Sequence, residues 1–232
     1  MLTTALAAAA AGGAVLAHGA LAPNSPVFGP VIGRGPREPA IYLTFDDGPN
    51  PRATEPILRL LERERVPATF FLVGRHVERF PDLARAVVQS GQSVGNHTYS
   101  HTRLALLGPR RIEEELSRTH AAILDRTGTA PRAFRAPHGY RSPFLRRAAG
   151  RFAYRVVGWT VGVWDTDRPG AAVIRERVRQ RIRPGAVLLL HDGDGYDPEG
   201  DRLQTAEALP GILDDVRARG WELRALGPLL DA

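Results

Sequence analysis

Two adjacent carboxylates end an apolar run near residue 45. Asp46 and Asp47 follow Ile-Tyr-Leu-Thr-Phe and precede Gly48-Pro49. Neighbouring residues on a strand point to opposite faces, so both carboxylates can face one pocket only if the chain turns at Gly48-Pro49. Such a pair, facing one pocket, could bind a metal ion and act as a base. Asp-Asp-Gly-Pro is also a common surface turn, and taken alone the stretch favours that simpler interpretation.

A pair of histidines, His97 and His101, frames the stretch His-Thr-Tyr-Ser-His. The four-residue spacing predicts that both imidazoles lie on one face of a single helical turn, which presents two nitrogen ligands to one metal ion. Two histidines and one carboxylate leave a coordination position open for water, as catalytic zinc requires. Either Asp46 or Asp47 supplies that carboxylate, and the other remains free as a base. The alternative is two solvated histidines on a loop.

A cation, Arg135, follows an apolar run in the stretch Phe-Arg-Ala-Pro-His-Gly. An arginine in this place can pair with a carboxylate and hold it ionised. Pro137 fixes the backbone before Gly139, so the amide between them can donate a hydrogen bond to an oxyanion. On its own this motif is weakly specific.

A further histidine, His191, closes the apolar run Ala-Val-Leu-Leu-Leu. A histidine at the mouth of a buried strand is well placed to act as a general acid or base. Asp165 closes another such run, and it could orient His191 and raise the pKa of its imidazole. The alternative for His191 alone is a satisfied polar cap at a strand end.

The apolar runs that carry these residues alternate with helical patterns. The expected strands cover residues 40–45, 68–74, 93–97, 133–137, 154–163, 186–193 and 221–226. The expected helices cover residues 54–65, 76–91, 109–128, 171–182 and 206–220, the last with Pro210 near its start. Such alternation predicts a parallel sheet, either a barrel or doubly wound. Ligands bind beyond the strand ends in these folds, where the candidate residues fall.

Composition limits the class of protein. The chain has 232 residues, 43% of them apolar, which is enough for a full core. Its net charge of +6 rests on 31 basic residues, all arginine, which are spread over predicted helices and often stand beside glutamate. This distribution is typical of solvated helix faces rather than of a phosphate-binding stripe, so we expect no nucleic-acid partner. The absence of cysteine excludes disulfides and thiolate chemistry.

Three segments are expected along the chain. Residues 1–22 form an apolar segment typical of a signal or membrane anchor, because residues 2–22 contain no Asp, Glu, Lys or Arg. An alanine-rich leader is the simpler alternative. Residues 23–38 are rich in proline and glycine and are expected to form a linker, and residues 39–232 form the catalytic domain. We therefore expect an exported, extracytoplasmic or membrane-anchored protein, with any membrane association through the N-terminus.

Taken together, the motifs resemble those of the polysaccharide deacetylase (NodB-homology) family of carbohydrate esterases, from about Ala40 to Leu226. The matching stretches are Thr-Phe-Asp-Asp-Gly-Pro, His-Thr-Tyr-Ser-His, Arg-Ala-Pro-His-Gly, Trp-Asp at Asp165 and Leu-Leu-Leu-His-Asp-Gly. The first, second and fifth are highly specific in combination. The resemblance implies an α/β fold, a distorted (β/α) barrel with about seven parallel strands.

The resemblance also implies a role for each candidate residue. A divalent metal, Zn²⁺ in the first instance with Co²⁺ or Mn²⁺ as alternatives, is expected on three ligands: Asp47, His97 and His101. The expected catalytic residues are the general base Asp46, its partner Arg135, the general acid His191 and its partner Asp165. The expected substrate-pocket residues are His138, whose backbone N–H is the oxyanion donor, Leu189, which contacts the acetyl methyl group, and Trp159.

Two departures from the family pattern stand in this sequence. His138 occupies a position that is often Tyr or Phe, which changes the wall of the cleft. In the fourth motif, Gly162 replaces an Asp and Thr166 replaces a Trp, while Trp164 precedes Asp165. The role expected of Asp165 is independent of both changes.

The implied activity is metal-dependent removal of N-acetyl or O-acetyl groups from a glycan such as a chitooligosaccharide or peptidoglycan. The N-acetylated glycan is the expected partner. One alternative is a related amidohydrolase that acts on a small amide or imide, or on a lipid-linked sugar. Another is a non-catalytic glycan-binding relative, but such relatives usually lack one of the base, the acid and the metal ligands, and this sequence retains them all.

Overall fold

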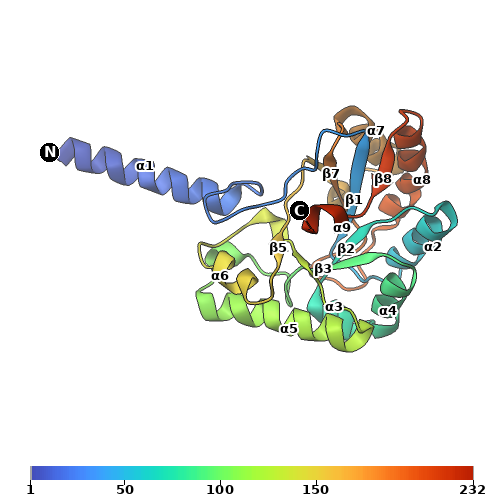
Figure 1. The fold of residues 1–232 in the computed structure, drawn as a ribbon, viewed down its shortest axis with the longest axis horizontal. Coiled ribbons are helices and arrows are strands. Elements are labelled where there is room, and N and C mark those ends of the chain that lie inside the picture. The colour runs from blue at the N-terminus through green and yellow to red at the C-terminus, as the bar shows by residue number, and fades with distance from the viewer. Residues whose placement is uncertain (1, 232) are drawn as a thin grey trace.

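A computed structural model describes the backbone of residues 2–231 and the side chains of residues 10–231. One parallel sheet organises the domain (Figure 1). Its strands are β1 (Ala40–Asp46), β2 (Thr69–Leu72), β3 (Ser93–Asn96), β4 (Ala133–Phe134), β5 (Arg155–Val156), β6 (Val161–Gly162), β7 (Ala186–His191) and β8 (Glu222–Arg224). Seven strands follow the order β5-β4-β3-β2-β1-β7-β6, and β8 pairs with the first residues of β1. The sheet curls into an incomplete barrel, which confirms the predicted α/β class.

The two edge strands are joined by the chain itself. The run 154–163, which the sequence presents as one strand, forms two: β5 pairs with β4, and β6 pairs with β7 at the opposite edge. Between them the backbone passes Gly158, whose amide bonds to the carbonyl of Ile32. The short link carries the chain across the open side of the curled sheet, so the prediction of a single strand was wrong here.

Helices cover the outside of the sheet (Figure 1). They are α2 (Thr54–Glu64), α3 (Gly74–Arg79), α4 (Pro81–Gln89), α5 (Pro109–Thr127), α6 (Leu145–Gly150), α7 (Ala171–Arg181), α8 (Leu203–Arg217) and α9 (Gly227–Leu230), with 3₁₀ turns at Leu104–Leu106, Pro137–Gly139 and Asp165–Asp167. Every residue of β1 is buried, because β1 lies mid-sheet between β2 and β7. Apolar residues of α2, α4, α7 and α8 complete the main core against it.

Two helix predictions were wrong in detail. The run 76–91 is interrupted at Phe80, where α3 ends, and Pro81 begins α4, because proline suits the first turn of a helix but not its interior. Helix α8 begins at Leu203, so Pro210 lies inside it rather than near its start.

The N-terminal segment forms helix α1 (Leu2–Leu21), which projects away from the domain (Figure 1). Among the described residues, no helix combines the length and the hydropathy needed to cross a membrane. The following segment, expected to be a linker, lies against the domain. Ile32 bridges to Val157, Arg34 bridges to Ala186, and Asn24 donates to the carbonyl of Trp159. The hydrophobic pattern of residues 23–38 did not indicate this packing, because the packing rests on backbone bridges and on hydrogen bonds to backbone carbonyls.

Candidate active site

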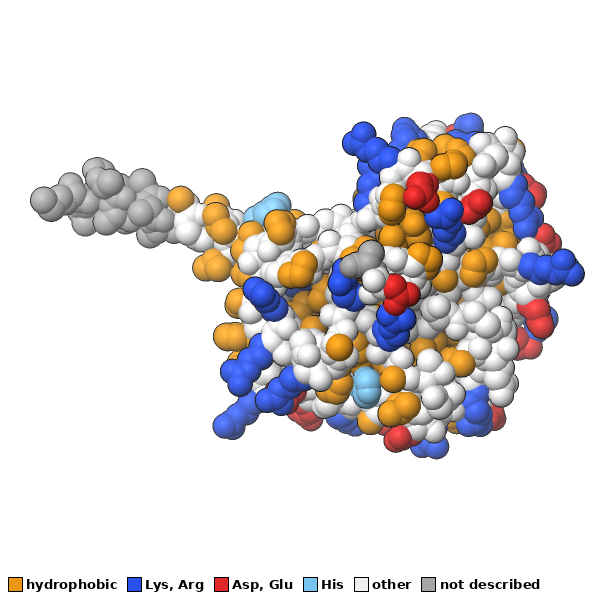
Figure 2. Space-filling view, in the orientation of Figure 1, with side chains coloured by type: hydrophobic (Ala, Val, Ile, Leu, Met, Phe, Trp, Pro, Cys, Tyr) orange, Lys and Arg blue, Asp and Glu red, His pale blue; other side chains and the backbone are white. Residues whose placement is uncertain are grey.

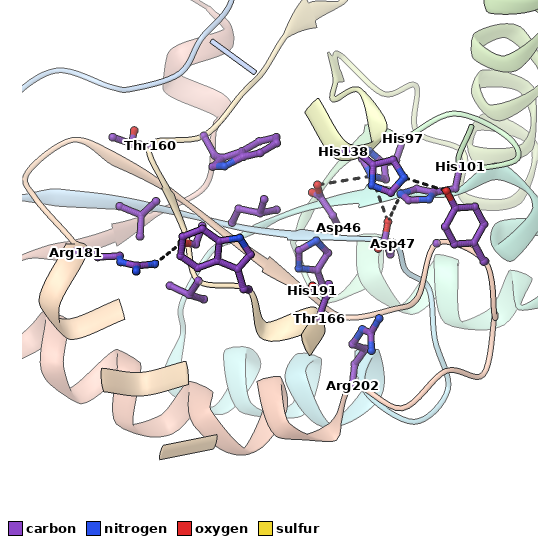
Figure 3. Close-up of a pocket in the computed structure, with 18 of the residues that line it drawn as sticks. Asp46, Asp47, His97, His101, His138, Thr160, Thr166, Arg181, His191 and Arg202 are labelled. Atoms are coloured by element: carbon purple, nitrogen blue, oxygen red, sulfur yellow. Dashed lines mark hydrogen bonds and ion pairs between the residues drawn. The ribbon is translucent and has the colours of Figure 1, made fainter. Parts of the chain in front are cut away.

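The predicted site residues meet at the carboxyl end of the sheet. Asp46 ends β1, His97 follows β3, Arg135 follows β4 and His191 ends β7. In a parallel sheet the carboxyl ends of all strands lie on the same side, and a cleft of about 980 Å³ opens on that side. Figure 3 shows Asp46, Asp47, His97 and His101 pointing toward one another, with His191 facing the same space.

Asp47 lies between the two predicted histidine ligands. Its Oδ1 is 3.3 Å from Nε2 of His97 and 2.9 Å from Nε2 of His101. One candidate ligand atom from each residue falls within 4.8 Å of the others, and all three side chains are buried. Ligands that share one Zn²⁺ at about 2.0–2.2 Å lie roughly 3 Å apart, so this spacing suits a shared cation.

The hydrogen bonds around these residues also fit a metal ion. Nδ1 of His97 donates to the carbonyl of Arg135 at 2.8 Å, which leaves the Nε2 lone pair facing Asp47, as in metal-binding histidines. Within the described chain, Oδ1 of Asp47 is buried without a well-formed hydrogen bond. A buried anionic oxygen of this kind needs a counter-charge, and a divalent cation held by Asp47, His97 and His101 would supply it.

The loop that carries the histidines is not helical, contrary to the sequence prediction. Residues 97–101 bend, with Thr98 at φ 66° and His101 at φ 57°. Glu115 of α5 stabilises the loop by accepting hydrogen bonds from the amides of Tyr99 and Ser100. The two imidazole centroids still lie 5.1 Å apart. The left-handed turns of the loop therefore bring the two rings together, as the spacing of residues on a helix would also have done.

Asp46 forms its shortest ion pair with Arg135, and only its second oxygen approaches a predicted metal ligand. Arg135 is fully buried and donates to Oδ1 of Asp46 at 2.7 Å, and also to the hydroxyl of Thr44 and the carbonyl of Gly158. Its guanidinium lies 4.2 Å above the Phe71 ring. These contacts direct one oxygen of Asp46 to Arg135. The other, Oδ2, lies 3.7 Å from Nε2 of His97, beside the expected metal position.

The electrostatics of Asp47 favour the ionised form. Burial raises the pKa of this carboxyl, but the nearby imidazoles of His101 and His97 outweigh burial and hold the pKa well below its ordinary value. The side chain is therefore a carboxylate at neutral pH. The backbone carbonyl of Asp47 accepts a hydrogen bond from Nδ1 of His76 at 2.9 Å, a positioning contact that no sequence motif indicated.

His191 pairs with the buried carboxylate of Asp165. Nδ1 of His191 lies 2.8 Å from Oδ1 of Asp165, and the His191 amide donates to Oδ2. Burial lowers the pKa of His191, but the charge of the buried Asp165 and its hydrogen bond outweigh burial and raise the pKa to about 9. The imidazole thus carries a proton at neutral pH. Thr205 of α8 donates to Asp165 as well, and the sequence contained no signal for it.

The three substrate-pocket candidates line the same cleft. Leu189 and Trp159 flank Gly162, where an added Cβ would lie 3.2 Å from Trp159 Nε1 and 4.0 Å from Leu189. His138 adopts φ 57° directly after Pro137, and its ring packs edge-on against His101 with centroids 4.9 Å apart. Tyr196, which the sequence did not single out, bonds to Nε2 of His138 at 3.0 Å.

A family model described as polysaccharide deacetylase matches residues 33–157. The chain belongs to the polysaccharide deacetylase family. It is 38% identical over 199 residues to a chitooligosaccharide deacetylase of Bradyrhizobium sp. (strain ANU 289), a match that covers 82% of this chain and 90% of the relative.

Solved structures also superpose on this member of the polysaccharide deacetylase family. A peptidoglycan N-acetylglucosamine deacetylase in complex with 4-naphthalen-1-yl-N-oxidanyl-benzamide matches with a TM-score of 0.81 at 30% identity, covering 87% of this chain and 93% of that one. A CE4 family pseudoenzyme from Bacillus anthracis matches with a TM-score of 0.78 at 31% identity, covering 86% and 68% respectively. The similar structures therefore include one protein described as a deacetylase and one described as a pseudoenzyme.

Proposed function

We propose that the protein hydrolyses the N-acetyl groups of a glycan, with chitooligosaccharides and peptidoglycan as the substrate classes to test first. The observation that carries this proposal is the pairing of the two adjacent carboxylates with different partners, Asp47 with His97 and His101, and Asp46 with Arg135. One carboxylate is placed to bind a cation and the other to accept a proton. The names of the relatives support an acetylated glycan as the substrate.

Asp47, His97 and His101 would hold a divalent cation, for which we propose Zn²⁺ before Co²⁺ or Mn²⁺. Such a cation, when bound, lowers the pKa of water and polarises a carbonyl. Two histidines and a carboxylate match a common set of catalytic zinc ligands, which supports this order.

Asp46 accepts the proton of the attacking water at Oδ2, since Arg135 occupies Oδ1. A base must lie within hydrogen-bond reach of the proton it removes, and the position of Oδ2 beside His97 meets this requirement. The backbone N–H of His138 donates to the developing oxyanion, and removal of one such donor costs about 3–4 kcal/mol in related chemistry.

His191 donates its proton to the departing amine, because Asp165 occupies Nδ1 and leaves Nε2 for the substrate. Leu189 and Trp159 enclose the acetyl methyl group on the apolar wall of the cleft. Acetate and a free amine are the products, and no covalent enzyme intermediate is required.

The test is acetate release from chitooligosaccharides, peptidoglycan fragments and small amides by the chelator-treated protein, before and after addition of Zn²⁺, Co²⁺ or Mn²⁺. Metal-dependent acetate release from a glycan supports the proposal, and hydrolysis of only small amides supports the related amidohydrolase. Metal binding without hydrolysis of any substrate supports a pseudoenzyme role.

We further propose export of the protein, with association of helix α1 with a membrane surface. The run from residue 2 to residue 22 has no Asp, Glu, Lys or Arg, which supports this location. Cell fractionation of the full chain, compared with a chain that lacks residues 2–22, tests it. Equal recovery of both forms in the cytoplasmic fraction contradicts it.

A further inference from the structure

The active-site cleft extends well beyond the three predicted metal ligands, Asp47, His97 and His101. Its far half is lined by Thr160–Trp164, Gln180, Arg181 and Arg183. Figure 3 shows Arg181 and Thr160 at the opposite end of the pocket from Asp47, His97 and His101. A cleft of about 980 Å³ is at the upper end of the range for small-ligand sites. It therefore has room for groups beyond the acetamide that reacts.

The charged residues that line this far half are all arginines. The acidic residues that line the cleft, Asp46 and Asp47, belong to the catalytic end. A third lining arginine, Arg202, pairs with Asp194 at 2.7 Å. Among the described side chains, neither Arg181 nor Arg183 lies within salt-bridge distance of a carboxylate. The far half of the cleft thus presents uncompensated positive charge.

Helix α7 separates paired from unpaired arginines by face. Arg175 pairs with Asp215 at 2.8 Å and Arg179 pairs with Glu176 at 2.7 Å. Arg177 and Arg181, which lie on another face of α7, instead donate to backbone carbonyls of residues 162–164. Asp215 of α8 and Glu176 of α7 thus pair with the first two arginines, whereas among the described side chains no carboxylate pairs with Arg177 or Arg181. Solubility alone does not require this division.

Arg181 is held in place by two contacts. It donates to the carbonyl of Gly162 at 3.2 Å, and its guanidinium lies 4.5 Å from the Trp164 ring. Trp164 itself is 57% exposed and has a left-handed backbone, with φ 50°. A guanidinium has five N–H donors in a planar fork that suits carboxylate and phosphate oxygens, and the carbonyl bond uses one of them.

We propose that Arg181 and Arg183 form a subsite for an anionic group on the sugar next to the one that is deacetylated. This inference rests on the proposed deacetylation, because it deepens the substrate class of the same cleft. Arg183 donates to the carbonyls of Gln180 and Ile182 through one nitrogen, Nη1, which leaves its other N–H donors for a ligand. A carboxylate or phosphate pairs with the free donors of both guanidinium groups, whereas a neutral chitooligosaccharide brings no charge to pair with them. The preferred substrate is then an N-acetylated glycan with acidic substituents.

The test compares three glycans of equal length: a neutral N-acetylglucosamine oligomer, one with a carboxylate on the neighbouring sugar, and one with a phosphate there. We expect the metal-loaded protein to have a higher kcat/KM for an acidic glycan, with the preference weakening as salt is raised. The double variant Arg181→Gln/Arg183→Gln should reduce the acidic-to-neutral ratio by about tenfold.

The matched control is the double variant Arg175→Gln/Arg179→Gln, which removes the same amount of charge from helix α7 at positions that do not line the cleft. Its acidic-to-neutral ratio should stay near that of the unaltered protein. An equal loss in both double variants overturns the subsite, as does the absence of any preference for an acidic glycan. Preference for carboxylate over phosphate, or the reverse, identifies the anion.

Binding by the metal-loaded Asp46→Asn protein provides a readout without turnover. Calorimetry with the same glycans should give tighter binding of an acidic one, and Arg181→Gln/Arg183→Gln should abolish the difference. If no glycan releases acetate, the proposed function fails, yet the calorimetric difference still decides the subsite. If acetate is released but binding shows no difference between acidic and neutral glycans, only the subsite fails.

Discussion

His191 and Asp165 are joined by two contacts rather than one. The imidazole Nδ1 lies 2.8 Å from Oδ1 of the carboxylate, and the backbone amide of His191 donates to Oδ2 at 2.8 Å. The second contact fixes the carboxylate relative to the strand that carries the histidine. Asp165 therefore sets both the orientation and the charge of His191, and both can be tested with one substitution.

Asp165→Asn should shift the alkaline limb of the kcat/KM profile to lower pH. Burial lowers the pKa of His191, but Asp165 overcomes burial and raises the value to about 9, from an ordinary 6.5. Asp47 also contributes to the rise, and a bound cation offsets that part, so the limb lies at or below pH 9. Loss of the Asp165 charge moves the limb toward 6.5, and a pH–rate profile measures it.

The same variant has a signature in folding stability. A histidine with a raised folded-state pKa contributes stability that is fully present below pH 6.5 and is lost as pH rises through about 9. Asp165→Asn should thus reduce the free energy of unfolding more at pH 6 than at pH 10. Asp167→Asn, in the same 3₁₀ turn but exposed, is the control. Identical pH profiles for the two variants would contradict the role of Asp165.

Arg135→Met should reduce the free energy of unfolding by about 3–5 kcal/mol, because it leaves the buried Asp46 carboxylate without its partner. Urea denaturation measures the change. Arg59→Met is the control, since its ion pair with Glu55 is exposed, and such pairs are worth up to about 1 kcal/mol. A similar small loss in both variants would show that the pair with Asp46 is not the buried interaction described.

Gly195→Ala should weaken metal binding, although residue 195 is not a ligand. A Cβ at this position would lie 2.1 Å from Nδ1 of His101, and His101 is buried at 4% exposure, so its ring must shift. Disturbing the surroundings of a metal ligand typically costs 10- to 100-fold in affinity, and a competition assay with a chromophoric chelator measures this. Gly108→Ala, where an added Cβ meets no atom within 4 Å, should bind metal normally. Equal affinities would contradict the contact.

Much of the site could be predicted from sequence because its residues follow apolar runs that become strands. Asp46, His97, Arg135 and His191 all lie at the edge where parallel strands end, as predicted. The family resemblance assigned Asp46 and Asp47 to different roles, and in the structure the two carboxylates have different partners, Arg135 for Asp46 and His101 for Asp47. The loop at 97–101 could not be predicted correctly, because Glu115, distant in sequence, stabilises its left-handed turns.

Contacts from distant segments were also beyond sequence analysis. Thr205 lies on α8 and carries no motif, yet it bonds to Asp165. The packing of residues 23–38 depends on single bridges to Val157 and Ala186, which hydrophobic periodicity does not reveal. The distribution of arginine in the sequence predicts that these residues lie on solvated helix faces. This holds for Arg175 and Arg179, but Arg181 faces the cleft, and only the fold distinguishes the two sets.

The most direct measurement is acetate release from an N-acetylglucosamine oligomer by the Zn²⁺-loaded protein and by Asp46→Asn, with bound zinc determined in the same samples. The account predicts that Asp46→Asn retains zinc close to the level of the unaltered protein and loses acetate release by several orders of magnitude. Asp47→Asn should instead lose zinc. Acetate release by Asp46→Asn near that of the unaltered protein would contradict the assignment of the two adjacent carboxylates to different tasks.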